Sequence, residues 1–94
     1  MQYIIHHLRA LHAFESFGRL GSVSAAAREL GVTPGAISQQ IKILEEQLQM
    51  QLIMKDGRRA SLAPRAKAYH AVLSSGFEKL KQAQHLLSQQ VADL

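Results

Sequence analysis

The chain has 94 residues, of which 47% are apolar and none is cysteine, and its formal charge at pH 7 is +4. This length is that of one small domain, the composition is too apolar for a disordered chain, and the lack of cysteine excludes disulfides and thiolate metal sites. No apolar run approaches the ~20 residues that cross a bilayer, and residues 1–3 lack the charged-then-apolar pattern of a signal peptide, so we expect a soluble, cytoplasmic protein.

Two helices are expected first. Apolar residues recur at three-residue spacing from Leu8 to Phe17, which predicts a helix over residues 8–18 that ends at Gly18. Residues 24–30 predict a second, shorter helix whose alanines allow close packing, and Gly31 stops it. Only the short break at residues 31–33 separates this helix from the next, as in a helix-turn-helix.

A third helix is predicted to begin at Pro34, because Thr33 is a good N-cap and proline suits the first helical position. One face carries apolar residues in an i, i+4, i+7, i+11 pattern that faces a core, and another face is small and polar. The apolar face comprises Ile37, Ile41, Leu44 and Leu48, and the polar face comprises Gly35, Ser38, Gln39 and Lys42. Glu45 and Glu46 follow in the C-terminal half, so charge is polarised along the helix.

A hairpin and a long helix are expected to complete the chain. Residues 52–54 and 60–62 are candidate strands around a turn at Asp56-Gly57. After Pro64, apolar residues at three- and four-residue steps predict a long helix whose stripe one chain cannot bury, with Phe77 and Val91 beside it. The stripe comprises Ala66, Tyr69, Leu73, Gly76, Leu80, Ala83, Leu87 and Leu94. A second copy, a membrane surface or a helix of another protein could cover it, although few lysines flank it, which counts against the membrane.

The third helix, the starts of the second and third helices, and the basic stretch around the hairpin carry the candidate DNA contacts. A helix enters the major groove only where its residues are short, and Ser38, Gln39 and Lys42 can then hydrogen-bond base edges. Helix N-termini and basic side chains suit phosphates, and five of the eleven lysines and arginines fall within residues 55–67. The candidate contacts are Ser22, Ser24, Thr33, Pro34, Gly35, Ser38, Gln39, Lys42, Lys55, Arg58, Arg59 and Arg65.

The order of residues also resembles the helix-turn-helix signature of the LysR-type bacterial transcriptional regulators. The resemblance begins at Leu11-x-x-Phe14, continues through residues 21–30 and 32–48, and extends through Leu52 and Arg58 to Pro64. It implies a mainly helical, winged helix-turn-helix fold, with three core helices and a two-stranded wing in residues 1–64 and a linker helix in residues 65–94. It also implies an inverted-repeat operator read by a homodimer, with the third helix in the major groove and the wing on the backbone or minor groove.

The resemblance further implies that the linker helix pairs two subunits antiparallel. The candidate dimer contacts are Tyr69, Leu73, Phe77, Leu80 and Leu87. LysR-type regulators carry a larger carboxy-terminal domain that senses a small-molecule effector. Because these 94 residues do not include such a domain, we expect a fragment. A higher oligomer is left open for a full-length chain. The chain departs from the family pattern at Gln49, where the family has glycine, and also at Ile53, Lys55, Ala63 and Ala66. The wing and the start of the fourth helix are therefore expected to be aimed slightly differently.

Other functions have weaker support in the residues. Five histidines match no zinc motif, so packing or surface roles are expected rather than a metal site. Glu15 with Glu29, or Glu45 with Glu46, could be read as a carboxylate pair, but adjacent helical residues point about 100° apart and do not converge. We therefore predict no enzyme and no cofactor. The main rival is a helical dimerisation or adaptor domain whose basic hairpin is incidental.

Overall fold

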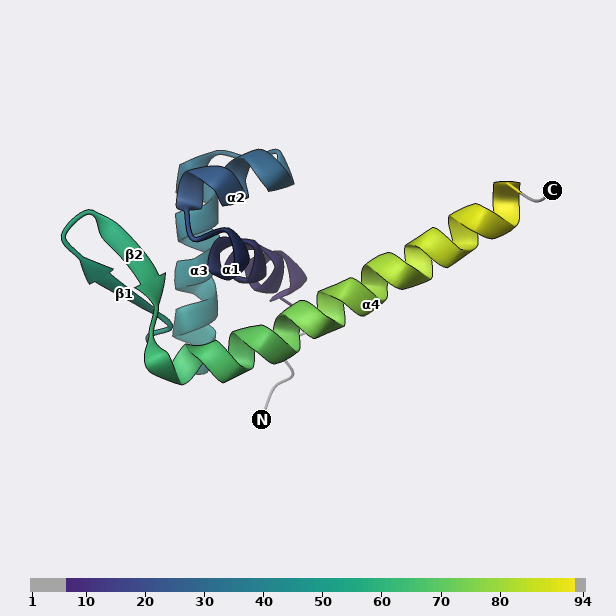
Figure 1. Cartoon of the computed structure of the whole chain (residues 1–94). Coiled ribbons are helices and arrows are strands. Elements are labelled where there is room, and N and C mark those ends of the chain that lie inside the picture. Colours follow the sequence, from purple (N-terminus) through teal and green to yellow (C-terminus); the bar gives the residue numbers. More distant parts are fainter. Residues whose placement is uncertain (1–6, 93–94) are drawn as a thin grey trace.

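The computed structural model describes residues 7–92, and their side chains as far as residue 90. Three helices and a two-stranded hairpin form a small body, and a long helix extends away from it (Figure 1). The chain measures 53 × 32 × 20 Å along its principal axes, and the long dimension reflects that helix. The predicted winged helix-turn-helix with a long fourth helix is confirmed.

Helix α1 (Leu8–Leu20) is longer than predicted. Gly18 does not end it; the helix continues to Leu20, and Gly21 closes it in the left-handed conformation, with φ 73°. Gly18 has a different role, because a Cβ at this position would lie 2.3 Å from Cδ2 of His70. The glycine therefore marks a close approach between α1 and α4 rather than a helix end.

Helices α2 (Val23–Leu30) and α3 (Pro34–Leu48) are both capped as their sequences indicate. The Ser22 hydroxyl accepts a hydrogen bond from the backbone N–H of Ala25, and the Thr33 hydroxyl accepts one from Ala36, both at 3.1 Å. Each oxygen satisfies an N–H group that has no acceptor within its own helix. These caps set where the two helices begin, and α2 begins one residue earlier than predicted.

Helix α3 ends at an unusual residue. Gln49 is its C-cap and has φ 51°, the only positive φ of a residue other than glycine within residues 7–92. A side chain in this region is disfavoured because Cβ crowds the carbonyl oxygen. The departure from the LysR-type pattern at Gln49 thus falls where the backbone conformation favours glycine.

Strands β1 (Ile53–Asp56) and β2 (Arg59–Leu62) form the antiparallel hairpin, in which Ile53 pairs with Leu62 and Asp56 with Arg59. The strands extend closer to the turn than predicted, so that only Gly57 and Arg58 connect them. Leu52 lies outside the strand. Its backbone N–H, like that of Ile53, donates to Oε2 of Glu45, so this carboxylate fixes the chain between α3 and the wing.

The core lies between α1, α2 and α3, and the start of the wing and the short 3-10 turn η2 (Pro64–Ala66) close it. Its largest fully buried apolar side chains are Phe14, Phe17, Ile37, Leu44 and Leu52. The apolar face predicted for α3 is confirmed, since Ile37, Ile41 and Leu44 are buried and Leu48 packs against them. Tight packing here holds α2 and α3 in one arrangement.

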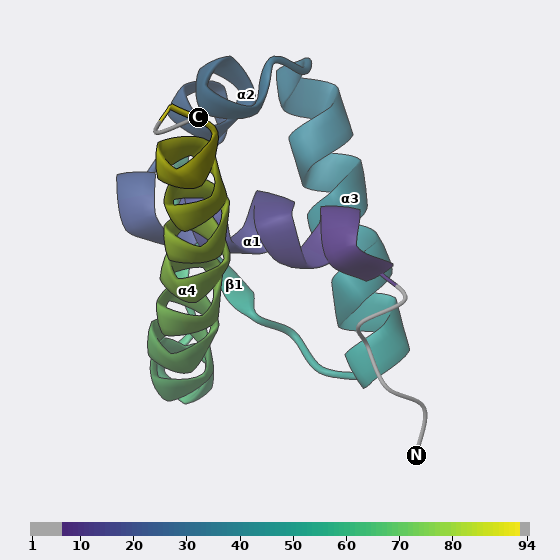
Figure 2. The same cartoon turned by 90° about the vertical axis from the view of Figure 1, so that its right-hand side faces the viewer.

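Helix α4 (Lys67–Ala92) follows η2 and crosses α1, so that α1 lies between α4 and α3 (Figure 2). The prediction that its whole apolar stripe needs an external partner was wrong for the first half. Ala66 is fully buried, and Tyr69, Leu73 and Phe77 pack against the core of the same chain. Leu80 and Leu87 are 57% and 63% exposed. Leu94 and the side chain of Val91 lie outside the described residues.

No helix in the described part of the chain has both the length and the apolar character needed to cross a lipid bilayer.

Candidate nucleic-acid interface

The polar face of α3 is exposed along its N-terminal half. Gly35, Ser38, Gln39 and Lys42 are all exposed, whereas Ile37 and Ile41 between them point into the core. Ser38, Gln39 and Lys42 line a shallow hollow on this face. Short residues near the start of the helix and three hydrogen-bonding side chains on one side give a surface that can approach a groove closely and contact base edges.

The N-termini of α2 and α3 are also accessible. Ser24, Thr33 and Pro34 are exposed and Ser22 is half-buried. The Ser22 and Thr33 hydroxyl oxygens accept backbone hydrogen bonds, so their hydrogens are available to another acceptor. The first N–H groups of a helix carry partial positive charge, which favours anions. Both helix starts can therefore bind phosphate.

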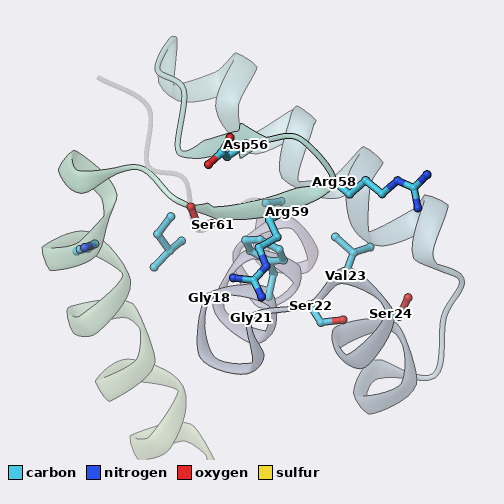
Figure 3. A pocket seen from close by; sticks show the side chains of 13 residues that line it. Gly18, Gly21, Ser22, Val23, Ser24, Asp56, Arg58, Arg59 and Ser61 are labelled. Atoms are coloured by element: carbon cyan, nitrogen blue, oxygen red, sulfur yellow. The ribbon is translucent and has the colours of Figure 1, made fainter.

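A groove separates the wing from the start of α2. Arg58 and Arg59 from the wing and Ser22 and Ser24 from α2 line it, as does Lys67 at the start of α4. Figure 3 shows Arg59 extending toward Gly18 and Gly21, and Arg58 reaching out on the side of Val23 and Ser24. Cations on one wall and helix-terminal N–H groups on the other make this groove suited to a chain of phosphates.

Residues predicted separately thus converge only in part. Arg58, Arg59, Ser22 and Ser24 share the groove, whereas Lys55 and Arg65 are exposed but do not line it. Lys67 was counted in the basic stretch but was not among the candidate contacts, and it does line the groove. Its position follows from where η2 turns the chain into α4, which no local sequence signal indicates.

The cations of this surface are not neutralised within the described residues. Between residues 7 and 90, ion pairs join Arg19 to Glu15 and Glu29 and Lys81 to Glu78, and none involves a cation of α3 or of the wing. Asp56 is the only acidic residue that lines the groove. The surface therefore keeps its positive charge for an anionic partner.

A second polar cluster lies where α4 packs against α1, and it includes a residue of α2. It consists of Glu15, Ser16, Arg19, Glu29, His70 and Ser74, and we call it the Glu15 cluster. Burial alone would raise the pKa of Glu15, but hydrogen bonds from Arg19 and Ser74, together with the charge of Arg19, outweigh burial and lower that pKa. Hydrogen bonds from Arg19 and Ser16 lower the pKa of Glu29. The carboxylates of Glu15 and Glu29 do come together, contrary to the expectation from their spacing, because both bind Arg19.

Two of the described histidines, His12 and His70, have packing roles, whereas His85 is exposed. His12 stacks on Phe77 with ring centroids 4.8 Å apart, and His70 lies edge-on to Phe14 at 5.7 Å. No group of three or more potential metal ligands occurs among the described residues, and His6 lies outside them. These rings hold α4 against α1.

Comparisons with known proteins agree with this geometry. Residues 8–67 match the family described as "Bacterial regulatory helix-turn-helix protein, lysR family". The HTH-type transcriptional regulator TrpI of Pseudomonas aeruginosa is 41% identical over 86 residues, which cover 92% of this chain and 29% of the relative. The AhcY transcriptional activator HvrB of Rhodobacter capsulatus is 39% identical over 80 residues, which cover 85% of this chain and 27% of the relative. The chain thus spans under a third of the length of these curated relatives.

Solved structures show the same fold. The BenM DBD in complex with catB site 1 DNA has a TM-score of 0.75 and 24% identity, covering 87% of this chain and 91% of that one. The probable transcriptional regulator PA0477 from Pseudomonas aeruginosa has a TM-score of 0.74 and 26% identity, covering 81% of this chain and 25% of that one.

Proposed function

The chain belongs to the lysR family of bacterial regulatory helix-turn-helix proteins, which are DNA-binding transcription regulators and not enzymes, and we propose that it reads an inverted-repeat operator as a homodimer. The observation that carries this proposal is the exposed polar face of α3 close to a groove lined by wing cations and the start of α2. Together they offer base-reading and phosphate-binding groups to one duplex.

In this proposal α3 lies in the major groove. Ser38 and Gln39 hydrogen-bond base edges, Gln39 being suited to adenine, and Lys42 reaches a guanine edge or a phosphate. Gly35 leaves room for the backbone to approach the bases. The exposure of all four residues, with the adjacent Ile37 buried, supports this orientation of the helix.

The helix starts and the wing would hold the DNA phosphates on both sides of the major groove. Ser22, Ser24, Thr33 and Pro34 belong to the helix starts, and Arg58 and Arg59 to the wing, where they contact the backbone or the minor groove. Lys55 and Arg65 are proposed as peripheral contacts, because they are exposed but do not line the protein groove between the wing and α2. We add Lys67, which lines it.

Dimerisation is proposed through α4, where residues 65–94 act as a linker helix beside the DNA-reading body of residues 1–64. The exposed Leu80 and Leu87 would form the contact along the outer half of α4. Tyr69, Leu73 and Phe77 line an apolar hollow with Leu8 and Leu11 from α1, so a partner helix could seat there too. Covering this surface would remove apolar area from water, which favours association.

Selection of random duplexes on the purified chain tests this function. We expect an enriched inverted repeat whose binding weakens steeply between two salt concentrations, because each phosphate contact releases counterions. A scrambled duplex of the same length is the control. If no sequence were enriched and the salt response were flat, a helical adaptor function through α4 would be the better account.

Two substitutions separate base reading from phosphate binding. Gln39→Ala should lower the affinity for the selected operator about 5- to 100-fold and leave the affinity for random DNA nearly unchanged, because it removes a base contact. Arg58→Ala should weaken both DNAs alike and lower the salt slope by about one. Gln47→Ala, at the exposed far end of α3, and Lys79→Ala, on α4, are the matched controls. An equal loss on both DNAs for Gln39→Ala would refute its role.

A further inference from the structure

The Glu15 cluster joins three helices through one buried carboxylate. The Glu15 side chain is 4% exposed, and its Oε2 accepts hydrogen bonds from Nε of Arg19 at 2.9 Å and from Oγ of Ser74 at 2.7 Å. Arg19 also contacts Glu29 of α2 at 2.5 Å, and the Ser16 hydroxyl bonds the same carboxylate. None of these residues lines the proposed DNA groove or the hollow on α3, so the proposed DNA contacts do not account for them.

Helix α4 is attached to this cluster at two points, one helical turn apart. Ser74 donates to the side chain of Glu15, and Nε2 of His70 lies 2.9 Å from the backbone oxygen of the same residue. Two attachments along α4 to one residue of α1 fix both the crossing angle and the rotation of α4 about its axis. The His70 ring also fits against Gly18, where a side chain would collide with it.

The neighbouring apolar contacts define the direction of α4 less sharply. Phe14 and Tyr69 pack at 5.7 Å between ring centroids, and His12 stacks on Phe77. Apolar contacts have no preferred direction, whereas a hydrogen bond weakens steeply once its angle falls below about 120°. The polar cluster therefore adds directional contacts to the orientation of α4 that the aromatic packing around it does not supply.

Arg19 connects the same joint to the helix-turn-helix. Its guanidinium bridges Glu15 of α1 and Glu29 near the end of α2, which the short turn joins to α3. Bonds to both carboxylates raise the pKa of Arg19 above its ordinary value, so the bridge stays charged at any physiological pH. The cluster thus spans α2, α1 and α4 as one hydrogen-bonded unit.

From this geometry we infer that the Glu15 cluster sets the half-site spacing that the protein accepts, with Glu15 and Ser74 as positioning residues. The inference rests on the proposed dimerisation through α4. In such a dimer, the angle between α4 and the body determines how far apart the two α3 helices lie. One added base pair moves a half-site by about 3.4 Å and rotates it around the duplex. If the attachment of α4 to the body is rigid, the dimer can reach the moved half-site only by straining that attachment.

The test measures binding of the 94-residue chain to inverted repeats whose half-sites are moved together or apart by one or two base pairs. For the native chain we expect one preferred half-site spacing, with affinity lower by about tenfold or more at shorter and longer spacings, since docking depends on half-site geometry. Ser74→Ala should reduce this discrimination to about threefold or less, because it removes a directional hydrogen bond to a charged group. Its affinity for a duplex with a single half-site should stay within about twofold of native.

Matched variants separate positioning from a general loss of structure. Ser75→Ala removes the same hydroxyl at the adjacent, exposed position and should keep the native spacing profile. Ser74→Thr keeps a hydroxyl and should restore the profile. Glu15→Gln is a second probe that removes the charge at nearly constant shape and should broaden the profile further. If it fails to fold, Ser74→Ala, which loses a single oxygen, decides the question.

The outcomes distinguish this inference from the proposed function. A native chain that enriches no inverted repeat overturns both. A native chain that binds inverted repeats equally well at every spacing, or a Ser74→Ala variant with an unchanged spacing profile, overturns the positioning role alone. Loss of single half-site binding in Ser74→Ala would show that the hydroxyl maintains the body instead, and would also overturn it.

Discussion

The inner and outer halves of α4 have apolar residues at the same spacing but lie in different surroundings. Tyr69, Leu73 and Phe77 pack against the core of their own chain, whereas Leu80 and Leu87 are more than half exposed. Every described residue from Glu78 to Gln90 is exposed. Periodicity in a sequence therefore identifies the apolar face of a helix but not the surface that covers it.

The difference arises because α1 crosses only the start of α4. Beyond Phe77 the helix extends past the body (Figure 1), and its described side chains are all exposed. The inner half should therefore contribute to the stability of a single chain, and the outer half to association. Three substitutions test how α4 is held, starting with the largest expected effect, and a fourth tests the end of α3.

Removing the ring that holds the inner half of α4 should destabilise the body most. Phe14 is fully buried and contacts Tyr69 and His70, so Phe14→Ala should lower the free energy of unfolding by about 3–5 kcal/mol. Urea titration at low protein concentration measures this. Leu86→Ala in the outer half, where the side chain is 58% exposed, should change the same quantity by about 0.5 kcal/mol or less. Equal losses would contradict the division.

A charge in the outer half should break association without unfolding the chain. Leu87→Glu should raise the dimer dissociation constant by about tenfold or more, since it removes the burial of a leucine worth about 1.5–3 kcal/mol in each copy. Analytical ultracentrifugation measures the constant, and circular dichroism should show unchanged helix content. Gln82→Glu adds the same charge about 140° away on the helix and should have a smaller effect. A dimer that tolerates Leu87→Glu would place the interface elsewhere.

Acid should loosen the attachment of α4 to the body at the Glu15 cluster. Because the pKa of Glu15 and that of Glu29 are lowered in the folded chain, their contribution to stability is complete above the ordinary carboxyl value of 4.5. It is lost as the pH falls through the lowered values. At pH 7 the native chain should exceed Glu15→Gln in unfolding free energy by about 1.5–3 kcal/mol. This gap should narrow in acid.

Urea titrations from pH 7 to pH 3 measure the gap at each pH. Glu78→Gln, whose side chain is 63% exposed, is the control and should follow the native curve. A gap that stays constant down to pH 3 would show that the charge of Glu15 has no part in the joint.

The smallest effect is expected at the C-cap of α3, far from α4. Gln49→Gly should stabilise the chain by about 0.5–1 kcal/mol, because glycine adopts the positive φ of this position without strain. Gln47→Gly, two residues earlier in the exposed last turn of α3, should destabilise it by a similar amount. Thermal unfolding of both variants measures the opposite signs. Destabilisation by Gln49→Gly would mean that the side chain, not the backbone, matters there.

Local signals in the sequence accounted for much of the fold and part of the candidate site. Thr33 and Pro34 predicted the start of α3, and the apolar spacing predicted which face of it is buried. The same signals failed at Gly18, because a glycine that ends a helix and one that admits a neighbouring ring look alike in sequence. Whether the candidate contacts bind DNA stays a prediction, and Lys67 was missed because the groove forms only when the wing and α4 meet α2.

By itself, the sequence determined the order of elements, the polarity of α3 and membership of the lysR family, since caps, turns and helical periodicity act over a few residues. Only the tertiary structure decided which half of α4 is buried, and that Glu15 meets Arg19, Glu29 and Ser74. Glu15 and Ser74 are 59 positions apart. Such contacts depend on how whole helices cross, and helix crossing is set by the packing of many side chains at once.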